Sequence, residues 1–159
     1  MDEILRILQE NARESVENIA RMLDLPVDEV ASRIKQFEEA GVIRGYQAIV
    51  DEEKIGVRAV TAVIEVKVTP ERRHGFDTVA RRIAEFPEVR SLYLVSGTFD
   101  LLLFVQGSTL QEVAGFVSSK LAPMEGVTST CTHFMLKTYK DRGLIMEPSE
   151  TYEKLKISL

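Results

Sequence analysis

Residues 89–106 read VRSLYLVSGTFDLLLFVQ, and this stretch decides the fold of the second half of the chain. Two apolar runs flank the short polar turn Ser96–Asp100, whose glycine and aspartate are residues typical of tight turns. The pattern predicts a β-hairpin with one strand over Val89–Val95 and the next over Leu101–Gln106.

The segments on either side of this hairpin extend it into a doubled β-α-β pattern. Ala59–Val68 alternates in the manner of a strand, with Val60, Ala62, Ile64, Val66 and Val68 on one face. An apolar helical stripe of Phe76, Val79, Ala80 and Ile83 follows and stops at Pro87. After the hairpin, Ser108–Gln111 has the form of a capping box. It predicts a helix with a buried face of Leu110, Val113, Ala114, Val117 and Leu121, before a last strand over Val127–Tyr139.

The order β-α-β-β-α-β predicts an α+β, ferredoxin-like domain, in which two helices cover one face of an antiparallel sheet. Apolar residues fall on both sides of the strands, for example Leu92 and Leu94 against Tyr93 and Val95. A domain of this size is not expected to expose a second apolar face, so we expect two copies to associate through their sheets.

The first third of the chain predicts three short helices. Apolar residues recur at helical spacing over residues 2–10, and Ser15 can cap a second helix. Asp24-Leu25-Pro26 predicts a tight turn before a third helix over Pro26–Ala40, which Gly41 ends. The arrangement is that of a helix-turn-helix. A strand over Val42–Asp51 and a hinge over 51–56 then predict two domains, residues 1–52 and 53–159.

Composition narrows the class of protein. The 159 residues carry a net charge of −5, which divides unevenly between the expected domains: −6 over residues 1–52 and +1 over 53–159. No apolar run approaches the roughly 20 residues of a membrane span, and the acidic start Met1-Asp2-Glu3 lacks the features of a signal peptide. The single cysteine excludes an internal disulfide framework. We therefore expect a soluble, cytoplasmic protein with no membrane partner.

Several motifs together resemble the Lrp/AsnC (feast/famine) family of transcriptional regulators. The resemblance covers essentially residues 2–140. It is carried by residues 4–13 (ILRILQENAR), Ile19-Ala20, residues 33–46 (RIKQFEEAGVIRGY), Ser96–Asp100, and Val127 with Thr130 and Thr132. It implies a winged helix-turn-helix, a ligand-sensing second domain and a regulator that binds double-stranded DNA and responds to an amino acid. It also implies a dimer that assembles further into octamers.

The third helix would then enter the major groove of DNA. Its candidate contact residues are Asp28, Ser32, Arg33, Lys35 and Gln36. Arg33 and Lys35 can meet phosphates, whereas Ser32 and Gln36 can hydrogen-bond base edges. The alternative is a solvated helix face with Glu29–Arg33 and Lys35–Glu39 pairs. The sequence departs from the family where Pro26 replaces the usual capping serine, and a domain at −6 repels a phosphate backbone.

The expected effector site is the turn between the hairpin strands. Its candidate residues are Ser96, Gly97, Thr98, Phe99 and Asp100, with Thr130 and Thr132 nearby. A glycine turn can present backbone N–H groups to a carboxylate, and Asp100 can accept hydrogen bonds from an ammonium group. The alternative is a hairpin turn in which the aspartate bonds only to backbone.

No metal site or cofactor is expected. His74 and His133 lie in different elements, and Cys131 is interpreted as a small buried residue. Arg72-Arg73 and Arg81-Arg82 are interpreted as a solvated face, and residues 141–159 as a tail. Two other functions remain open: a sensing or assembly module that does not bind DNA, and an enzyme similar to siroheme decarboxylases. No cluster of His, Arg and Tyr suited to a tetrapyrrole is apparent, so we expect no enzymatic activity.

Overall fold

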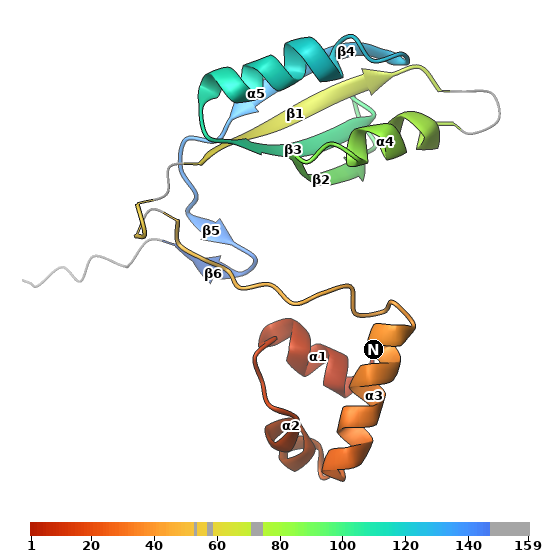
Figure 1. Cartoon of the computed structure of the whole chain (residues 1–159), viewed down its shortest axis with the longest axis vertical. Helices are drawn as coiled ribbons and strands as arrows, with labels where there is room; N and C mark the ends of the chain where they lie inside the picture. Colours follow the sequence, from red (N-terminus) through yellow and green to blue (C-terminus); the bar gives the residue numbers. More distant parts are fainter. Residues whose placement is uncertain (53, 57–58, 71–74, 147–159) are drawn as a thin grey trace, which may run out of the picture. The chain divides into compact units, whose positions relative to one another are not determined.

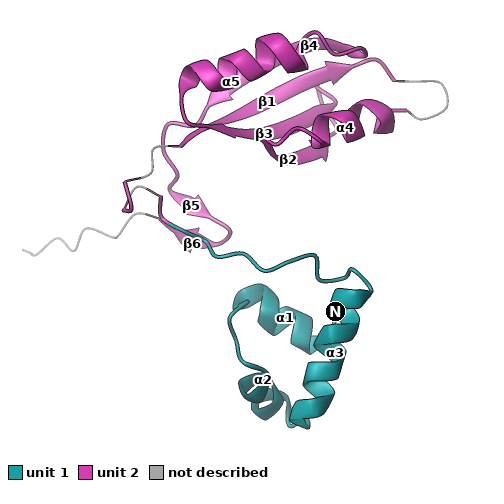
Figure 2. Ribbon diagram, in the orientation of Figure 1, with its two compact units in different colours: residues 1–50 teal, residues 51–159 magenta. Residues whose placement is uncertain are grey.

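The computed structural model describes residues 1–52, 54–56, 59–70 and 75–146. The chain divides into two compact units, Met1–Val50 and Asp51–Leu159, which are described separately (Figures 1 and 2). His74, Arg72-Arg73 and the tail segment 149–156 lie outside the described residues. Among those described, no helix has the length and apolar character needed to cross a bilayer.

Unit 1 contains three helices, α1 (Glu3–Glu10), α2 (Val16–Leu23) and α3 (Val27–Glu39). Their apolar stripes meet in a small core of Ile4, Leu8, Ile19, Ala20 and Val30. Asp2 and Ser15 cap α1 and α2 by accepting hydrogen bonds from the backbone N–H groups of Ile4 and Asn18. Asp24 ends α2 in the left-handed region, at φ 54°. The predicted helix-turn-helix arrangement is therefore present.

Gly41 ends α3 as the sequence predicts. Its φ of +66° is in the left-handed region. The backbone N–H groups of Gly41 and Val42 donate to the carbonyls of Glu38 and Phe37, which satisfies two groups at the helix end. Pro26 precedes α3 without a side-chain cap, because proline offers no acceptor there.

The strand expected over Val42–Asp51 is absent from the single chain. Residues 44–50 have no strand hydrogen bonds. A strand needs a neighbouring edge to satisfy its backbone groups. Val42, Tyr46 and Val50 are all exposed there.

Unit 2 is an antiparallel sheet covered by two helices. The sheet contains β1 (Val60–Val68), β2 (Val89–Leu94), β3 (Leu101–Gly107) and β4 (Val127–Phe134), in the order β2-β3-β1-β4. The helices are α4 (Asp77–Ala84) and α5 (Leu110–Phe116) (Figure 1). This is the predicted ferredoxin-like topology. A small hairpin, β5 (Lys140–Asp141) and β6 (Leu144–Ile145), follows.

The core of unit 2 lies between one sheet face and both helices. Strand β1 contributes Ala62, Ile64, Val66 and Val68, and β3 contributes Leu101, Leu103 and Val105. The helical contacts to these residues come from Val79 and Ile83 in α4, and from Val113 and Phe116 in α5. The opposite sheet face carries Val63, Tyr93, Leu102 and Phe104, as the strand registers require. None of the described helices covers these side chains. We call this side of the sheet the open face.

The structure corrects three details of the second helix and last strand. The capping box is shifted by one residue: Thr109, not Ser108, caps α5 by accepting from the N–H of Glu112. The Glu112 carboxylate in turn accepts from the N–H of Ser108, a stronger acceptor than the Gln111 amide would be. Leu110 and Ala114, which the sequence predicted to be buried, are exposed, and Phe116 is buried instead.

The other two differences concern element ends. The expected helix over 110–121 changes after Phe116 into a π-helical turn, η1 (Val117–Leu121), which keeps both Phe116 and Leu121 buried. The last strand ends at Phe134 instead of Tyr139, because its partner β1 begins near Val60 and offers nothing further to pair with. Residues 140–145 form the β5–β6 hairpin instead of part of a tail.

Candidate functional site

The solvent-facing side of α3 carries four of the five residues expected to contact DNA. Asp28, Ser32, Lys35 and Gln36 are exposed, and they lie opposite the core residue Val30. The amide of Gln36 donates to the Ser32 hydroxyl at 3.5 Å, so these two base-reading candidates are neighbours. Lys35 lies 3.7 Å from Glu39 in an exposed pair of the kind that contributes little to stability. This face is polar and available to a partner.

Arg33 differs from the other four. It was expected to be exposed, but it is half-buried, because its guanidinium pairs with Asp2 at the start of α1. Glu29 lies 3.9 Å away on its other side. Asp2 also caps α1 with its second oxygen, so one carboxylate joins the beginning of α1 to the middle of α3. Arg33 therefore holds the helices of unit 1 together.

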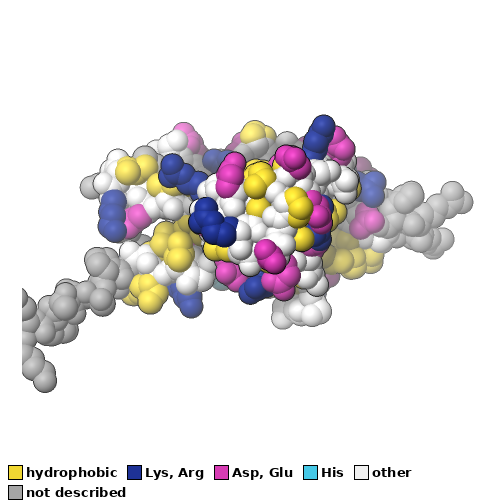
Figure 3. Space-filling model, turned by 90° about the horizontal axis from the view of Figure 1, so that it is seen from below, with side chains coloured by type: hydrophobic (Ala, Val, Ile, Leu, Met, Phe, Trp, Pro, Cys, Tyr) yellow, Lys and Arg dark blue, Asp and Glu magenta, His cyan; other side chains and the backbone are white. Residues whose placement is uncertain are grey.

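Charges of both signs are mixed on the surface. Figure 3 shows Lys and Arg side chains interspersed with Asp and Glu side chains on the face in view, with hydrophobic side chains between them. Tyr46 adds a local contact, since its hydroxyl donates to Glu38 at 2.9 Å. Partial burial, and then this hydrogen bond, raise the pKa of Tyr46.

In unit 2, Asp100 holds the turn Ser96–Asp100 against the end of β1. Its carboxylate accepts from the Val68 N–H at 2.9 Å, and its own N–H donates to the Val66 carbonyl. Ser96, Gly97 and Thr98 are exposed, while Phe99 is half-buried. Gly97 has φ +153° and open space around its Cα, so backbone groups of the turn are accessible. One Asp100 oxygen thus accepts a backbone hydrogen bond, which agrees with the alternative in which this aspartate serves the hairpin turn.

Thr130 and Thr132 lie at the same end of the sheet but across β1. They pair with Val66 and Ile64, two residues of the buried face, so their side chains are on the helix-covered side. Leu101, next to the turn, pairs with Val66 from the opposite edge of β1. Two strand spacings, roughly 10 Å, therefore separate the turn from Thr130. We expected the turn and the two threonines to lie near one another. The strand pairing shows that β1 lies between them.

A hollow of about 680 Å³ opens at the other end of the sheet. Arg90 and Gln106 line it, together with the carboxylates of Glu52, Glu88 and Glu112. Lys120 donates to Glu88 at 2.5 Å, and this hydrogen bond holds the pKa of Glu88 below its ordinary value. The second oxygen of Glu88 is buried and has no hydrogen-bond partner among the described residues. Sequence reasoning missed this hollow, because its lining comes from segments far apart in the chain.

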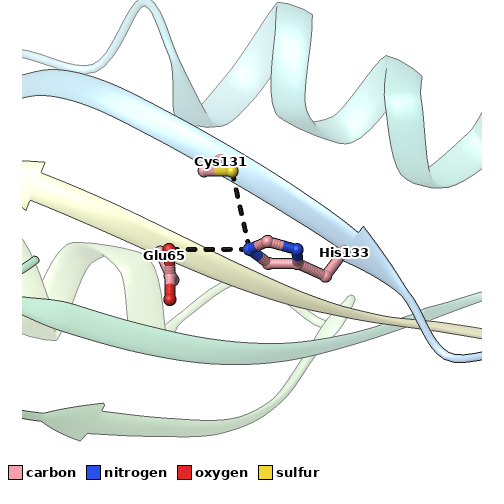
Figure 4. A group of neighbouring side chains, drawn as sticks. All are labelled: Glu65, Cys131 and His133. Carbon is pink, nitrogen blue, oxygen red and sulfur yellow. Dashed lines mark hydrogen bonds and ion pairs between the residues drawn. The ribbon is translucent and has the colours of Figure 1, made fainter.

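A second group that the sequence did not reveal lies on the open face. Glu65, Cys131 and His133 gather there from two neighbouring strands (Figure 4). Cys131 was expected to be buried, but it is only half-buried and free. Only the strand register could have revealed this group from the sequence: Cys131 pairs with Glu65, and His133 is two residues further along the same strand as Cys131.

Unit 1 and unit 2 together define a helix-turn-helix regulator with a ligand-binding second domain. A winged helix-turn-helix DNA-binding family model matches residues 3–44, and a model of the Lrp/AsnC ligand-binding domain matches residues 61–145. The chain belongs to the Lrp/AsnC family of transcriptional regulators, as its motifs indicated.

Relatives agree with this assignment. The chain is 46% identical over 157 residues to YugG of Bacillus subtilis (strain 168), named as an uncharacterized HTH-type transcriptional regulator, covering 98% of this chain and 95% of that one. It is 33% identical over 140 residues to a proline dehydrogenase transcriptional activator of Rhodobacter capsulatus, covering 88% and 90%. The solved Neisseria meningitidis regulator NMB0573 in complex with L-Met is similar at TM-score 0.67 and 27% identity, covering 89% and 93%.

The position of Arg33 generates a prediction about stability. Arg33→Met should lower the free energy of unfolding by about 1 kcal/mol, because the partly buried Asp2 carboxylate loses its partner. The matched control is Lys35→Met on the same helix, whose exposed pair with Glu39 should contribute less than about 0.5 kcal/mol. Thermal and urea unfolding monitored by helical circular dichroism measures both. Equal stability of the two variants would contradict the role of Arg33 in joining α1 to α3.

Proposed function

We propose that this protein binds an operator in double-stranded DNA through α3 and that a free amino acid, bound in unit 2, modulates this binding. The observation that carries the proposal is the α3 surface, where Ser32, Lys35 and Gln36 form an exposed polar face on a helix-turn-helix. We assign the contacts to Asp28, Ser32, Lys35 and Gln36, with Arg33 acting mainly within unit 1. We further propose that the protein acts in the cytoplasm. Its relatives are named as transcriptional regulators or activators, and these names favour regulation over catalysis.

Acidic residues in unit 1 limit the affinity of this unit for DNA. Asp28 and Glu29 are exposed at the start of α3, where they suit the helix dipole but face incoming phosphates. Phosphate neutralisation supplies much of the affinity of a protein for DNA. We therefore propose modest affinity per subunit, with two subunits binding two half-sites of a palindrome.

Selection of random duplex DNA by the purified protein, with and without pooled amino acids, tests DNA binding. We expect recovery of one palindromic motif. On that motif, Lys35→Glu should weaken binding at least about tenfold, because it places a negative charge against phosphates. Asp28→Asn should tighten binding across sequences for the opposite reason. Lys140→Glu, at an exposed residue of β5 and with the same change in charge, is the matched control. If the selection recovers no motif, or if both lysine variants bind alike, docking by α3 is wrong.

The open face supports a dimer as the basic unit. Phe104 packs edge-to-face on Tyr93 with ring centroids 6.2 Å apart, and Leu102 and Val63 lie beside them. Such a contiguous apolar surface is typical of an interface between copies. The segment 42–50 adds the exposed apolar side chains of Val42, Tyr46 and Val50. We propose that this segment becomes a strand by pairing with the same segment of a second copy. Dimers would assemble further, to octamers as the family resemblance implies.

Removal of apolar character from the open face tests the dimer. Phe104→Glu should convert the full-length protein to a monomer at micromolar concentration, because a charge on each copy would be buried in the interface. Ala114→Glu, on the exposed side of α5, introduces the same charge elsewhere and should leave the dimer intact. Sedimentation velocity measures both, with circular dichroism to establish that each variant is folded. A dimer that persists in a folded Phe104→Glu protein contradicts this interface.

For the effector, the turn Ser96–Asp100 has the chemistry that a zwitterion needs. Its exposed backbone around Gly97 can donate to a carboxylate, and the second oxygen of Asp100 can accept from an ammonium group. Thr130 and Thr132, across β1, would contact only the far end of the effector. The similarity to a regulator solved with L-Met supports an amino acid as the class of ligand.

A thermal-shift screen of the twenty amino acids at millimolar concentration tests the effector site. Asp100→Asn should abolish the shift while leaving the unliganded melting temperature within a few degrees, because the amide oxygen still accepts from Val68. Asp100→Ala should lower that temperature as well, since the Val68 N–H loses its partner at a cost of about 1 kcal/mol. Arg90→Gln in the hollow is the control. A response lost in Arg90→Gln but kept in Asp100→Asn would place the effector in the hollow instead.

A further inference from the structure

Three side chains of different chemistry converge on the open face of unit 2. Cys131 and His133 are two residues apart on β4, so both project from the same side of the strand. Glu65 on β1 is the direct cross-strand partner of Cys131. Figure 4 shows the three side chains turned toward one another above the two strands. The backbone register, which the buried face of β1 fixes, therefore holds all three ligand positions.

The distances within this group are those of a metal site. The His133 Nε2 atom lies 3.5 Å from the Cys131 Sγ atom and 3.5 Å from the Glu65 Oε2 atom. All three ligand atoms lie within 4.8 Å of one another. Bond lengths of about 2.0–2.3 Å in a tetrahedral zinc site imply ligand–ligand separations of roughly 3.3–3.6 Å. Two edges of the triangle already match, and a small rotation of one side chain would close the third.

We propose that Glu65, Cys131 and His133 bind a Zn²⁺ ion. Thiolate, imidazole and carboxylate are the three ligand types that zinc takes in proteins, whereas Mg²⁺ and Ca²⁺ prefer oxygen ligands alone. In the single chain the site is open to solvent, because the His133 side chain is 57% exposed and that of Glu65 is 33% exposed. On binding, the Cys131 thiol loses its proton to solvent and coordinates as thiolate.

Three ligands from this chain leave the fourth position of the ion to water. The open face also carries the proposed dimer contact, so the ion would lie on or beside that interface. Its protein ligands nevertheless all come from one chain, and the inference therefore depends neither on the dimer nor on the effector site.

Cobalt titration of the full-length, reduced protein tests the site, since Co²⁺ replaces Zn²⁺ and reports its ligands spectroscopically. We expect one Co²⁺ per chain, intense visible bands of tetrahedral Co²⁺ and a near-ultraviolet thiolate-to-cobalt charge-transfer band. Zn²⁺ should displace the Co²⁺ and remove both signals. Because Cys131 is the only cysteine, the charge-transfer band can come from no other residue of the chain.

Three variants and one control complete the experiment. Cys131→Ser should remove the charge-transfer band, and His133→Ala and Glu65→Gln should each weaken Co²⁺ binding at least about tenfold. His74→Ala removes the other histidine of the chain and should change neither the spectrum nor the affinity. Melting temperatures of the metal-free variants establish that each is folded. An absent charge-transfer band at stoichiometric Co²⁺ would overturn the proposal. So would an affinity that His133→Ala and Glu65→Gln leave unchanged, because the three side chains would then form only an ion pair beside a free thiol.

Discussion

Strand β1 is hydrogen-bonded along both edges, and the arrangement of unit 2 depends on this double pairing. One face of β1 carries Ala62, Ile64, Val66 and Val68, which are buried against α4 and α5. A slip of one residue would move these four side chains to the open face, so burial fixes the register with β3 and β4. The register in turn places Asp100 beside Val68 and Cys131 beside Glu65. The positions of the proposed effector turn and of the proposed zinc ligands are therefore consequences of the same apolar packing.

Unit 1 is held by a smaller core and relies more on polar contacts. Five buried residues from three helices form that core, and Asp2 joins α1 to α3 through Arg33. Asp2 caps α1, and the acidic residues Glu3, Glu17, Asp28 and Glu29 lie in the first turns of the helices, where they suit the helix dipoles. These carboxylates also contribute to the negative charge that opposes DNA. This conflict between helix stability and phosphate attraction is the main physical constraint on the DNA-binding function.

Asp100 and Arg33 show how a residue expected to serve function also serves structure. Each was predicted as a contact for a partner, and each is hydrogen-bonded within the chain. Exposed neighbours such as Ser32, Lys35 and Gln36 have no comparable long-range contact among those described for the chain, which makes them better probes of DNA binding. Variants that keep the structural hydrogen bond while removing a charge, such as Asp100→Asn, separate the two roles.

Periodicity and turn residues in the sequence were sufficient for the helix-turn-helix, the ferredoxin-like topology and the buried face of β1, because these features depend on local spacing of apolar residues. Family motifs were sufficient for the class of protein. The tertiary structure decided what depends on contacts between distant segments: the pairing of Arg33 with Asp2, the bond from Val68 to Asp100, and the meeting of Glu65 with Cys131 and His133. It also showed that residues 44–50 form no strand in the single chain, because strand pairing depends on a partner edge and not on local sequence alone.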